Sequence, residues 1–190
     1  MKRVILLAVF AAWISIPALA QGTAPKGFKS GAIQLADGSL LNGFVKDNLR
    51  SSAGIVFIAE NTTAKKTYTG NDLAGLQIEA NHYTCVRGDF FLTLCEGELC
   101  FLQKASDASA VPSYNGNETV FASGTEGSIG DYFLYNGKTR LLTLVNRKNL
   151  ATVAATCFSG HAAALDKARS AQNDLSQLRE AVELFNRDAE

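Results

Sequence analysis

The segment Thr84–Lys104, TCVRGDFFLTLCEGELCFLQK, is the most apolar stretch of the chain after its first twenty residues, and it decides the fold. Two β-prone runs flank Glu96-Gly97, a pattern that predicts an antiparallel hairpin with a two-residue turn. Alternation along such strands places five large apolar side chains on one face, namely Phe90, Leu92, Leu94, Leu99 and Phe101. Cys95, Cys100 and Leu102 are expected on the other face. We expect the first face to form one wall of the core.

Three of the four cysteines lie in this hairpin: Cys85, Cys95 and Cys100, with Cys157 far downstream. In an oxidising compartment four cysteines allow two disulfides, in three pairings. A two-residue turn makes Cys95 and Cys100 diagonal neighbours, which strains a disulfide, whereas a four-residue loop sets them directly opposite. The alternative is that these cysteines are buried as small apolar side chains. Both interpretations stay open at the level of sequence.

Residues 1–20 are predicted to be a signal peptide. Lys2 and Arg3 precede the apolar run Val4–Ile16, and Ala18-Leu19-Ala20 supplies the small residues that a signal peptidase recognises. Thirteen apolar residues are short for the ~20 of a membrane-spanning helix. No cysteine follows the expected cleavage after Ala20, so a lipoprotein is not expected. The sequence therefore predicts export to the periplasm or the cell exterior, with no transmembrane segment in the mature chain.

The mature chain has the size and charge of one ordinary domain. Cleavage leaves 170 of the 190 residues, enough to bury a core without disulfides or a metal. Removing Lys2 and Arg3 from the 18 basic residues leaves 16, against 18 acidic residues. Nucleic-acid binding is not expected, because it calls for a basic excess. We assign residues 21–30 to a linker and 31–190 to a single globular domain.

Residues 31–145 show the period of β-strands. Asp37-Gly38 and Asn136-Gly137 predict tight hairpins, and Gly54–Ala59 is a continuous apolar strand. Pairing about Asp37-Gly38 would place four side chains on one face: Ile33, Leu35, Leu40 and Phe44. Eight to ten strands with short connections imply an antiparallel sheet or a small barrel.

Residues 146–190 change to the period of helices. Leu150, Val153, Ala154 and Cys157 stand at i, i+3, i+4 and i+7, and Leu175, Leu178, Val182 and Phe185 form a later stripe. Gly160 is a suitable residue for the end of the first helix. Two or three helices are expected to pack on the β portion, because they cannot bury their apolar stripes alone. The predicted fold class is α+β.

Several of these segments together resemble a known family. They are GAIQLADGSLLNGFV (31–45), IVFIAEN (55–61), TYTGNDLAGLQIEANHYTCV (67–86) and FFLTLCEGELCFL (90–102). The chain is similar to uncharacterised exported β-rich proteins common in Bacteroidota, which open with a Gly-x-Ile, Asp-Gly/Thr, Gly-x-Ile hairpin and end in a Tyr-Asn helix. Phe185-Asn186 stands at that last motif here, with Phe in place of Tyr. The resemblance implies export and a β-rich domain, and carries no activity or site residue. A weaker resemblance to SH3-like and Sm-like barrels concerns shape only.

No catalytic, cofactor-binding or metal-binding set is predicted. Cys157 and His161 have the i, i+4 spacing of helical metal ligands, with Asp166 beyond, but Phe158-Ser159-Gly160 is expected to break the helix between them. Arg87-Gly88-Asp89 spells an adhesion tripeptide, yet its place between apolar strands favours a turn. Glycoside hydrolysis would need paired carboxylates, but nothing in the sequence places Glu126 near Glu96 and Glu98, which are expected to be solvated at the hairpin tip.

These observations favour a non-catalytic envelope or periplasmic protein that acts through binding or assembly, with another envelope protein as the expected partner. No cofactor is expected. The alternatives are a hydrolase of an unrecognised family, using residues of the long loops, and a carrier of a small hydrophobic ligand inside a closed barrel. A convergent cleft of two carboxylates would favour the hydrolase, and an internal cavity would favour the carrier.

Overall fold

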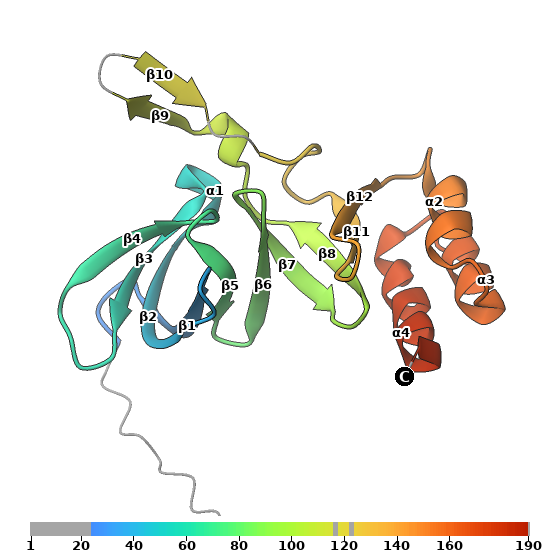
Figure 1. Cartoon of the computed structure of the whole chain (residues 1–190), viewed down its shortest axis with the longest axis horizontal. Helices are drawn as coiled ribbons and strands as arrows, with labels where there is room; N and C mark the ends of the chain where they lie inside the picture. Colours follow the sequence, from blue (N-terminus) through green and yellow to red (C-terminus); the bar gives the residue numbers. More distant parts are fainter. Residues whose placement is uncertain (1–23, 116–117, 122–123, 190) are drawn as a thin grey trace, which may run out of the picture.

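A computed structural model describes residues 24–115, 118–121 and 124–189 of the chain. The predicted signal peptide, residues 1–20, and the start of the predicted linker lie outside the described residues. The described chain is an antiparallel sheet followed by helices, which confirms the predicted α+β class (Figure 1). No helix of the described part is long and apolar enough to cross a membrane.

Ten strands form one sheet in the order β12-β11-β8-β7-β6-β5-β1-β2-β3-β4, with every neighbouring pair antiparallel. The sheet is open, with β12 and β4 at its edges, so it is not the closed barrel that the sequence left as an alternative. The strands are β1 (Lys29–Leu35), β2 (Leu40–Asn48), β3 (Gly54–Ala59), β4 (Lys65–Thr69), β5 (Leu73–Ile78), β6 (Asn81–Val86), β7 (Asp89–Cys95), β8 (Leu99–Lys104), β11 (Tyr132–Asn136) and β12 (Leu141–Val145).

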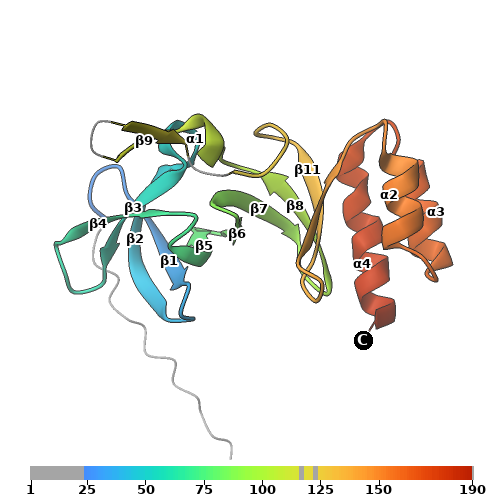
Figure 2. The same cartoon turned by 45° about the horizontal axis from the view of Figure 1, so that its top comes forward.

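The remaining elements are short. A 3₁₀ turn, η1 (Ala108–Ala110), leads to a separate two-stranded hairpin of β9 (Pro112–Asn115) and β10 (Glu118–Phe121), which stands away from the main sheet (Figure 1). The helices are α1 (Leu49–Ser52), α2 (Leu150–Cys157), α3 (Ala162–Ser170) and α4 (Leu178–Ala189), the last preceded by η2 (Leu175–Gln177). The sheet is curved. Strands β1–β5 curl on one side of the middle strands, and helices α2–α4 stack on the other side (Figure 2).

The first hairpin has a longer turn than predicted. The amide of Leu35 donates to the carbonyl of Ser39, and Gly38 has a φ of 89°, so the turn has three residues with a left-handed glycine at its end. The register pairs Ile33 with Leu41 and therefore reverses the faces expected for β2. Leu40 is 66% exposed, and the prediction that Leu40 and Phe44 share the inner face with Ile33 is wrong.

Two facing glycines allow β1 and β2 to curl. Gly31 and Gly43 are cross-strand partners. A Cβ on Gly43 would overlap the carbonyl oxygen of Ile58, and a Cβ on Gly31 would overlap that of Gln77. Glycine in a strand interior often marks such a close backbone approach. The glycines of the opening hairpin motif thus allow β1 to approach β5 closely and β2 to approach β3 closely within the sheet.

The central hairpin also departs from the predicted turn. Strand β7 ends at Cys95 and β8 begins at Leu99, so three residues connect them, and the register shifts between Thr93 and Cys95. This bulge turns Cys95 to the helix-covered face, where it packs with Leu94. The prediction that Cys95 shares a face with Cys100 is wrong, because Cys100 packs against the small cluster on the opposite face.

The face of the sheet that carries Phe90, Leu92 and Leu94 contributes to two separate cores. Phe90 belongs to the core enclosed by β1–β5, together with Ile33, Val45 and Ile55 among others. Leu94 packs against the core beneath the helices, which contains Leu99, Phe101 and Leu134 of the sheet together with Leu150, Val153, Ala154, Leu178, Val182 and Phe185 of the helices. The two predicted helical stripes are thus confirmed as core residues, with Cys157 and Leu175 half-buried at the border.

Asn186 fixes α4 to the tip of the central hairpin. Its Oδ1 accepts a hydrogen bond from the Leu99 amide at 3.0 Å, and its Nδ2 donates to the carbonyls of Leu99, at 2.9 Å, and Glu96, at 3.1 Å. One side chain therefore satisfies three backbone groups of the loop that joins β7 to β8. The Asn of the final Phe185-Asn186 motif thus has a structural role in this chain.

Candidate functional site

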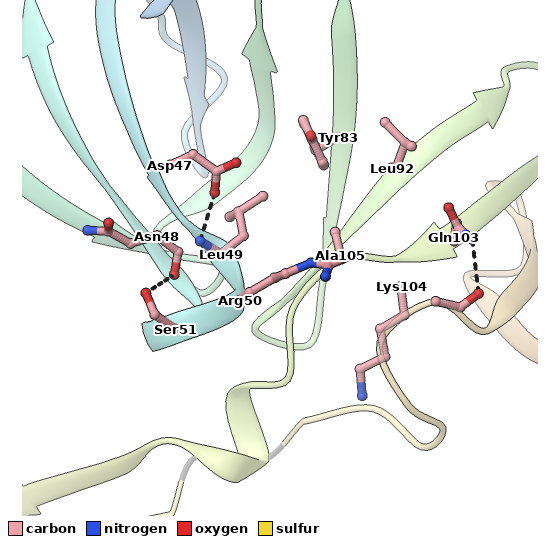
Figure 3. Close-up of a pocket in the computed structure, with 11 residues that line it drawn as sticks. Asp47, Asn48, Leu49, Arg50, Ser51, Tyr83, Leu92, Gln103, Lys104 and Ala105 are labelled. Carbon is pink, nitrogen blue, oxygen red and sulfur yellow. Dashed lines mark hydrogen bonds between the residues drawn. The ribbon is translucent and has the colours of Figure 1, made fainter. Parts of the chain in front are cut away.

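A cleft of about 420 Å³ lies between the two cores, over the middle strands of the sheet (Figure 3). Tyr83, Leu92 and Gln103 form its floor, and they are consecutive partners in the register across β6, β7 and β8. All three side chains are half-buried. The volume is within the range typical of small-molecule sites. The cleft is therefore large enough to hold a small ligand.

The first wall of the cleft is the end of β2 and the short helix α1. Leu49 is buried and anchors α1 in the first core. The Oδ1 atom of Asp47 accepts a hydrogen bond from the Leu49 amide at 2.9 Å, so the carboxylate both stabilises the first turn and is held in place. Arg50 is exposed and extends from α1 across the cleft, towards the side on which Ala105 lies (Figure 3).

The second wall is the chain at Lys104, Ala105 and Gly130. The Gly130 amide donates to the carbonyl of Lys104 at 2.8 Å, and the Nε2 of Gln103 donates to the carbonyl of Gly130 at 3.0 Å. Lys104 turns its Nζ away from the cleft in Figure 3 and is fully buried. Its ammonium donates to the carbonyls of Thr125, Glu126 and Gly127, which holds the loop before β11 against the sheet.

Asp89 is the buried counter-ion of Lys104. Its Oδ2 lies 3.3 Å from the Lys104 Nζ and accepts from the amide and the hydroxyl of Thr125, both at 2.7 Å. Its Oδ1 accepts from the Ala108 amide at 2.6 Å. Both carboxylate oxygens of Asp89 and the ammonium of Lys104 have hydrogen-bond or ion-pair partners within the protein, which indicates a structural role. Because Asp89 is fully buried, Arg87-Gly88-Asp89 does not present its carboxylate for adhesion.

The two charges that line the cleft do not neutralise each other. Asp47 and Arg50 stand three residues apart, but among the described residues neither forms an ion pair. The nearby Lys29 pairs instead with Glu79 at 2.8 Å. Burial and the carboxylate of Asp47 raise the pKa of Tyr83, with Lys29 opposing them in part, so the phenol keeps its proton at neutral pH. The described lining of the cleft thus offers the Asp47 carboxylate, the Arg50 guanidinium and the hydroxyls of Tyr83 and Ser51, the last of which donates to the carbonyl of Asn48.

A second hollow adjoins the cleft at Leu92 and reaches the wall of α4. Its lining includes His82, Thr93, Arg179 and Glu183. Arg179 and Glu183 are i, i+4 partners on α4 and bind each other at 2.8 Å. This hollow therefore carries no uncompensated charge from α4 and extends the cleft as a polar groove.

All four cysteines are unbridged: Cys85, Cys95, Cys100 and Cys157. The disulfide interpretation is not supported, and the half-buried thiols agree with the alternative of small apolar side chains. Cys85 packs against the first core, Cys95 and Cys157 against the helix-side core, and Cys100 against the opposite face of the sheet.

We predict that the four thiols differ in reactivity, with Cys85 the slowest. Burial raises the pKa of Cys85 to about 12, so at pH 8 its thiolate fraction in the folded protein is about 10⁻⁴. Alkylation with iodoacetamide, followed by peptide mass mapping, should modify Cys85 last, at a rate that rises with pH. In urea, without any reductant, all four should react. Fewer than four adducts in urea would contradict the free thiols.

The remaining candidate metal-binding and catalytic residues do not lie together in one site. Within residues 24–115, 118–121 and 124–189, no three His, Cys, Asp or Glu side chains lie close enough to hold a metal ion. Helix α2 ends at Cys157, one turn before His161, which lies 4.0 Å from Asp188 instead. Glu98 pairs with Lys138 at 2.6 Å. Of the described residues that line the cleft, Asp47 alone carries a carboxylate.

Sequence reasoning did not find the residues of the cleft. Asp47-Asn48 before Leu49-Arg50-Ser51 is a local signal for a helix start, since Asp and Asn favour such positions. That signal predicts α1 but not the strands on the other side of the cleft. Tyr83 and Gln103 lie in the part of the chain with the period of β-strands, and nothing in their spacing marks them as residues of a binding site.

Comparisons with protein-family models, with curated proteins and with solved structures found no match to this chain.

Proposed function

We propose that the chain is exported through its signal peptide to the periplasm or the cell exterior, and acts there as a non-catalytic binding protein. Its binding site is the cleft between the two cores. The observation that carries this proposal is the pair of opposite charges, Asp47 and Arg50, which line one concave site without forming ion pairs within the described chain. Convergent polar groups around an apolar side chain, here Leu92, are typical of ligand sites.

The cleft gives less support to a hydrolase. Hydrolysis of glycosides relies on two carboxyl groups that flank the scissile bond, and the described lining supplies Asp47 alone. Tyr83 keeps its proton, and no thiol or histidine lines the cleft in its described part. A carrier of hydrophobic ligands is also less well supported, because the sheet is open and its cores are filled by side chains of the protein.

Native mass spectrometry of the protein purified from the envelope of its own host tests this function. We expect the polypeptide to begin at Gln21 and to carry a non-covalent small molecule. Combined replacement of Asp47→Ala and Arg50→Ala should remove the bound mass. The matched control is Asp166→Ala with Arg169→Ala, an exposed pair with the same three-residue spacing on α3, which should retain it. An unliganded mass from repeated preparations, or a ligand that survives the cleft substitutions, would contradict the proposal.

A further inference from the structure

The cleft presents its two charges as separate binding groups rather than as an internal pair. The Asp47 carboxylate is tied to the Leu49 amide through Oδ1, which leaves Oδ2 directed to the cleft side without a partner among the described residues. Arg50, three residues further along the chain, extends from α1 across the cleft towards the side on which Ala105 lies (Figure 3). Both side chains are exposed, so a ligand with one charge would use one of them, and a ligand with two opposite charges would pair with both.

Each charge has neighbours that extend its recognition. The planar guanidinium of Arg50 matches a carboxylate, which it can bind through two parallel hydrogen bonds. The Tyr83 hydroxyl keeps its proton and is available to donate or accept. The amide of Gln103 is fixed by its hydrogen bond to Gly130, and its Oε1 atom, which has no hydrogen-bond partner in the described part of the chain, can accept a ligand N–H.

We propose that the cleft binds a zwitterion, an α-amino acid or short peptide whose carboxylate pairs with Arg50 and whose ammonium pairs with Asp47. This inference rests on the proposed function and specifies its ligand class. A purely anionic ligand such as a phosphate fits poorly, because Arg50 is the one cation of the described lining whose charged end is not bound by the protein, and Asp47 would repel the anion. The apolar floor at Leu92 accommodates a small side chain between the two charged ends.

Isothermal titration calorimetry on the mature chain tests the inference with four probes: L-alanine, dialanine, N-acetyl-dialanine, which lacks the ammonium, and dialanine amide, which lacks the carboxylate. We expect L-alanine or dialanine to bind, and the comparison between them distinguishes an amino acid from a peptide. N-acetyl-dialanine and dialanine amide should each bind about tenfold or more weakly than dialanine, the effect of one lost charge pair.

The variants should respond in a crossed pattern. Asp47→Asn should weaken dialanine but leave N-acetyl-dialanine unchanged, and Arg50→Gln should weaken dialanine but leave dialanine amide unchanged. The control, Asp166→Asn with Arg169→Gln, should match the wild type with every probe. Equal binding of blocked and free probes, or no binding of any of them, overturns the zwitterion. A native ligand lost only from the cleft variants would still uphold the proposed function in either case.

Discussion

Replacing Lys104 by Met is expected to lower the free energy of unfolding by about 3–5 kcal/mol. The substitution leaves the Asp89 carboxylate in a fully buried site without its counter-ion, and removing one partner of such a pair is strongly destabilising. It also frees three loop carbonyls that the ammonium binds. Because native domains are stable by only about 5–15 kcal/mol, this change endangers the fold. Urea unfolding followed by circular dichroism measures it.

A matched control separates the effect of breaking a buried ion pair from the effect of removing any lysine. Lys138 pairs with Glu98, but its side chain is 73% exposed, and exposed pairs contribute about 0–1 kcal/mol. Lys138→Met should therefore unfold near the wild-type midpoint. If Lys104→Met and Lys138→Met unfold at the same urea concentration, the buried pair does not stabilise the fold. Asp89→Asn provides the reciprocal test, because its amide would set a donor against the Thr125 amide.

Replacing Gly43 by Ala is expected to destabilise the protein by about 3 kcal/mol, the upper part of the range for overpacked sites. The new Cβ would overlap the backbone carbonyl of Ile58 and approach the ring of Phe57 to 2.9 Å. A backbone carbonyl within a paired strand cannot rotate away as a side chain does. Relief would require β3 to move from β2 and would disturb the first core.

Gly137→Ala is the control for this experiment, because a Cβ at Gly137 meets nothing within 4 Å. Its urea midpoint should lie close to that of the wild type. A Gly43→Ala protein with an unchanged midpoint would show that β2 and β3 do not approach as closely as described. The Gly31→Ala variant should behave like Gly43→Ala, since its Cβ would overlap the carbonyl of Gln77.

The elements of the fold could be predicted from periodicity, and their registers could not. Gly54–Ala59 forms β3 at the predicted residues, and the stripes at Leu150 and Leu178 are buried as helical spacing indicates. The faces of β2 were reversed because Asp37-Gly38 suits a two-residue turn and the end of a three-residue turn equally well. One residue more in a turn sends every following side chain to the other face.

The faces on which the cysteines of the central hairpin lie could not be predicted either, for a different reason. The bulge near Cys95 places Leu94 and Cys95 against one core, and strict alternation does not anticipate it. The cleft could not be predicted from the sequence. Asp47 and Gln103 are 56 positions apart, and they line the same cleft only because the curl of the sheet brings the end of β2 over β6–β8.

The hydrogen bonds of Asn186 have a consequence for the order in which the molecule is completed. The hairpin tip at Glu96 and Leu99 is closed by Asn186, which lies 87 positions after Leu99 in the sequence. Synthesis proceeds from the N-terminus, so β7 and β8 exist long before the residue that fastens their loop. Until α4 docks, its residues Leu178, Val182 and Phe185 are missing from the core that contains Phe101. The docking of α4 therefore completes this core and fastens the hairpin tip in the same step.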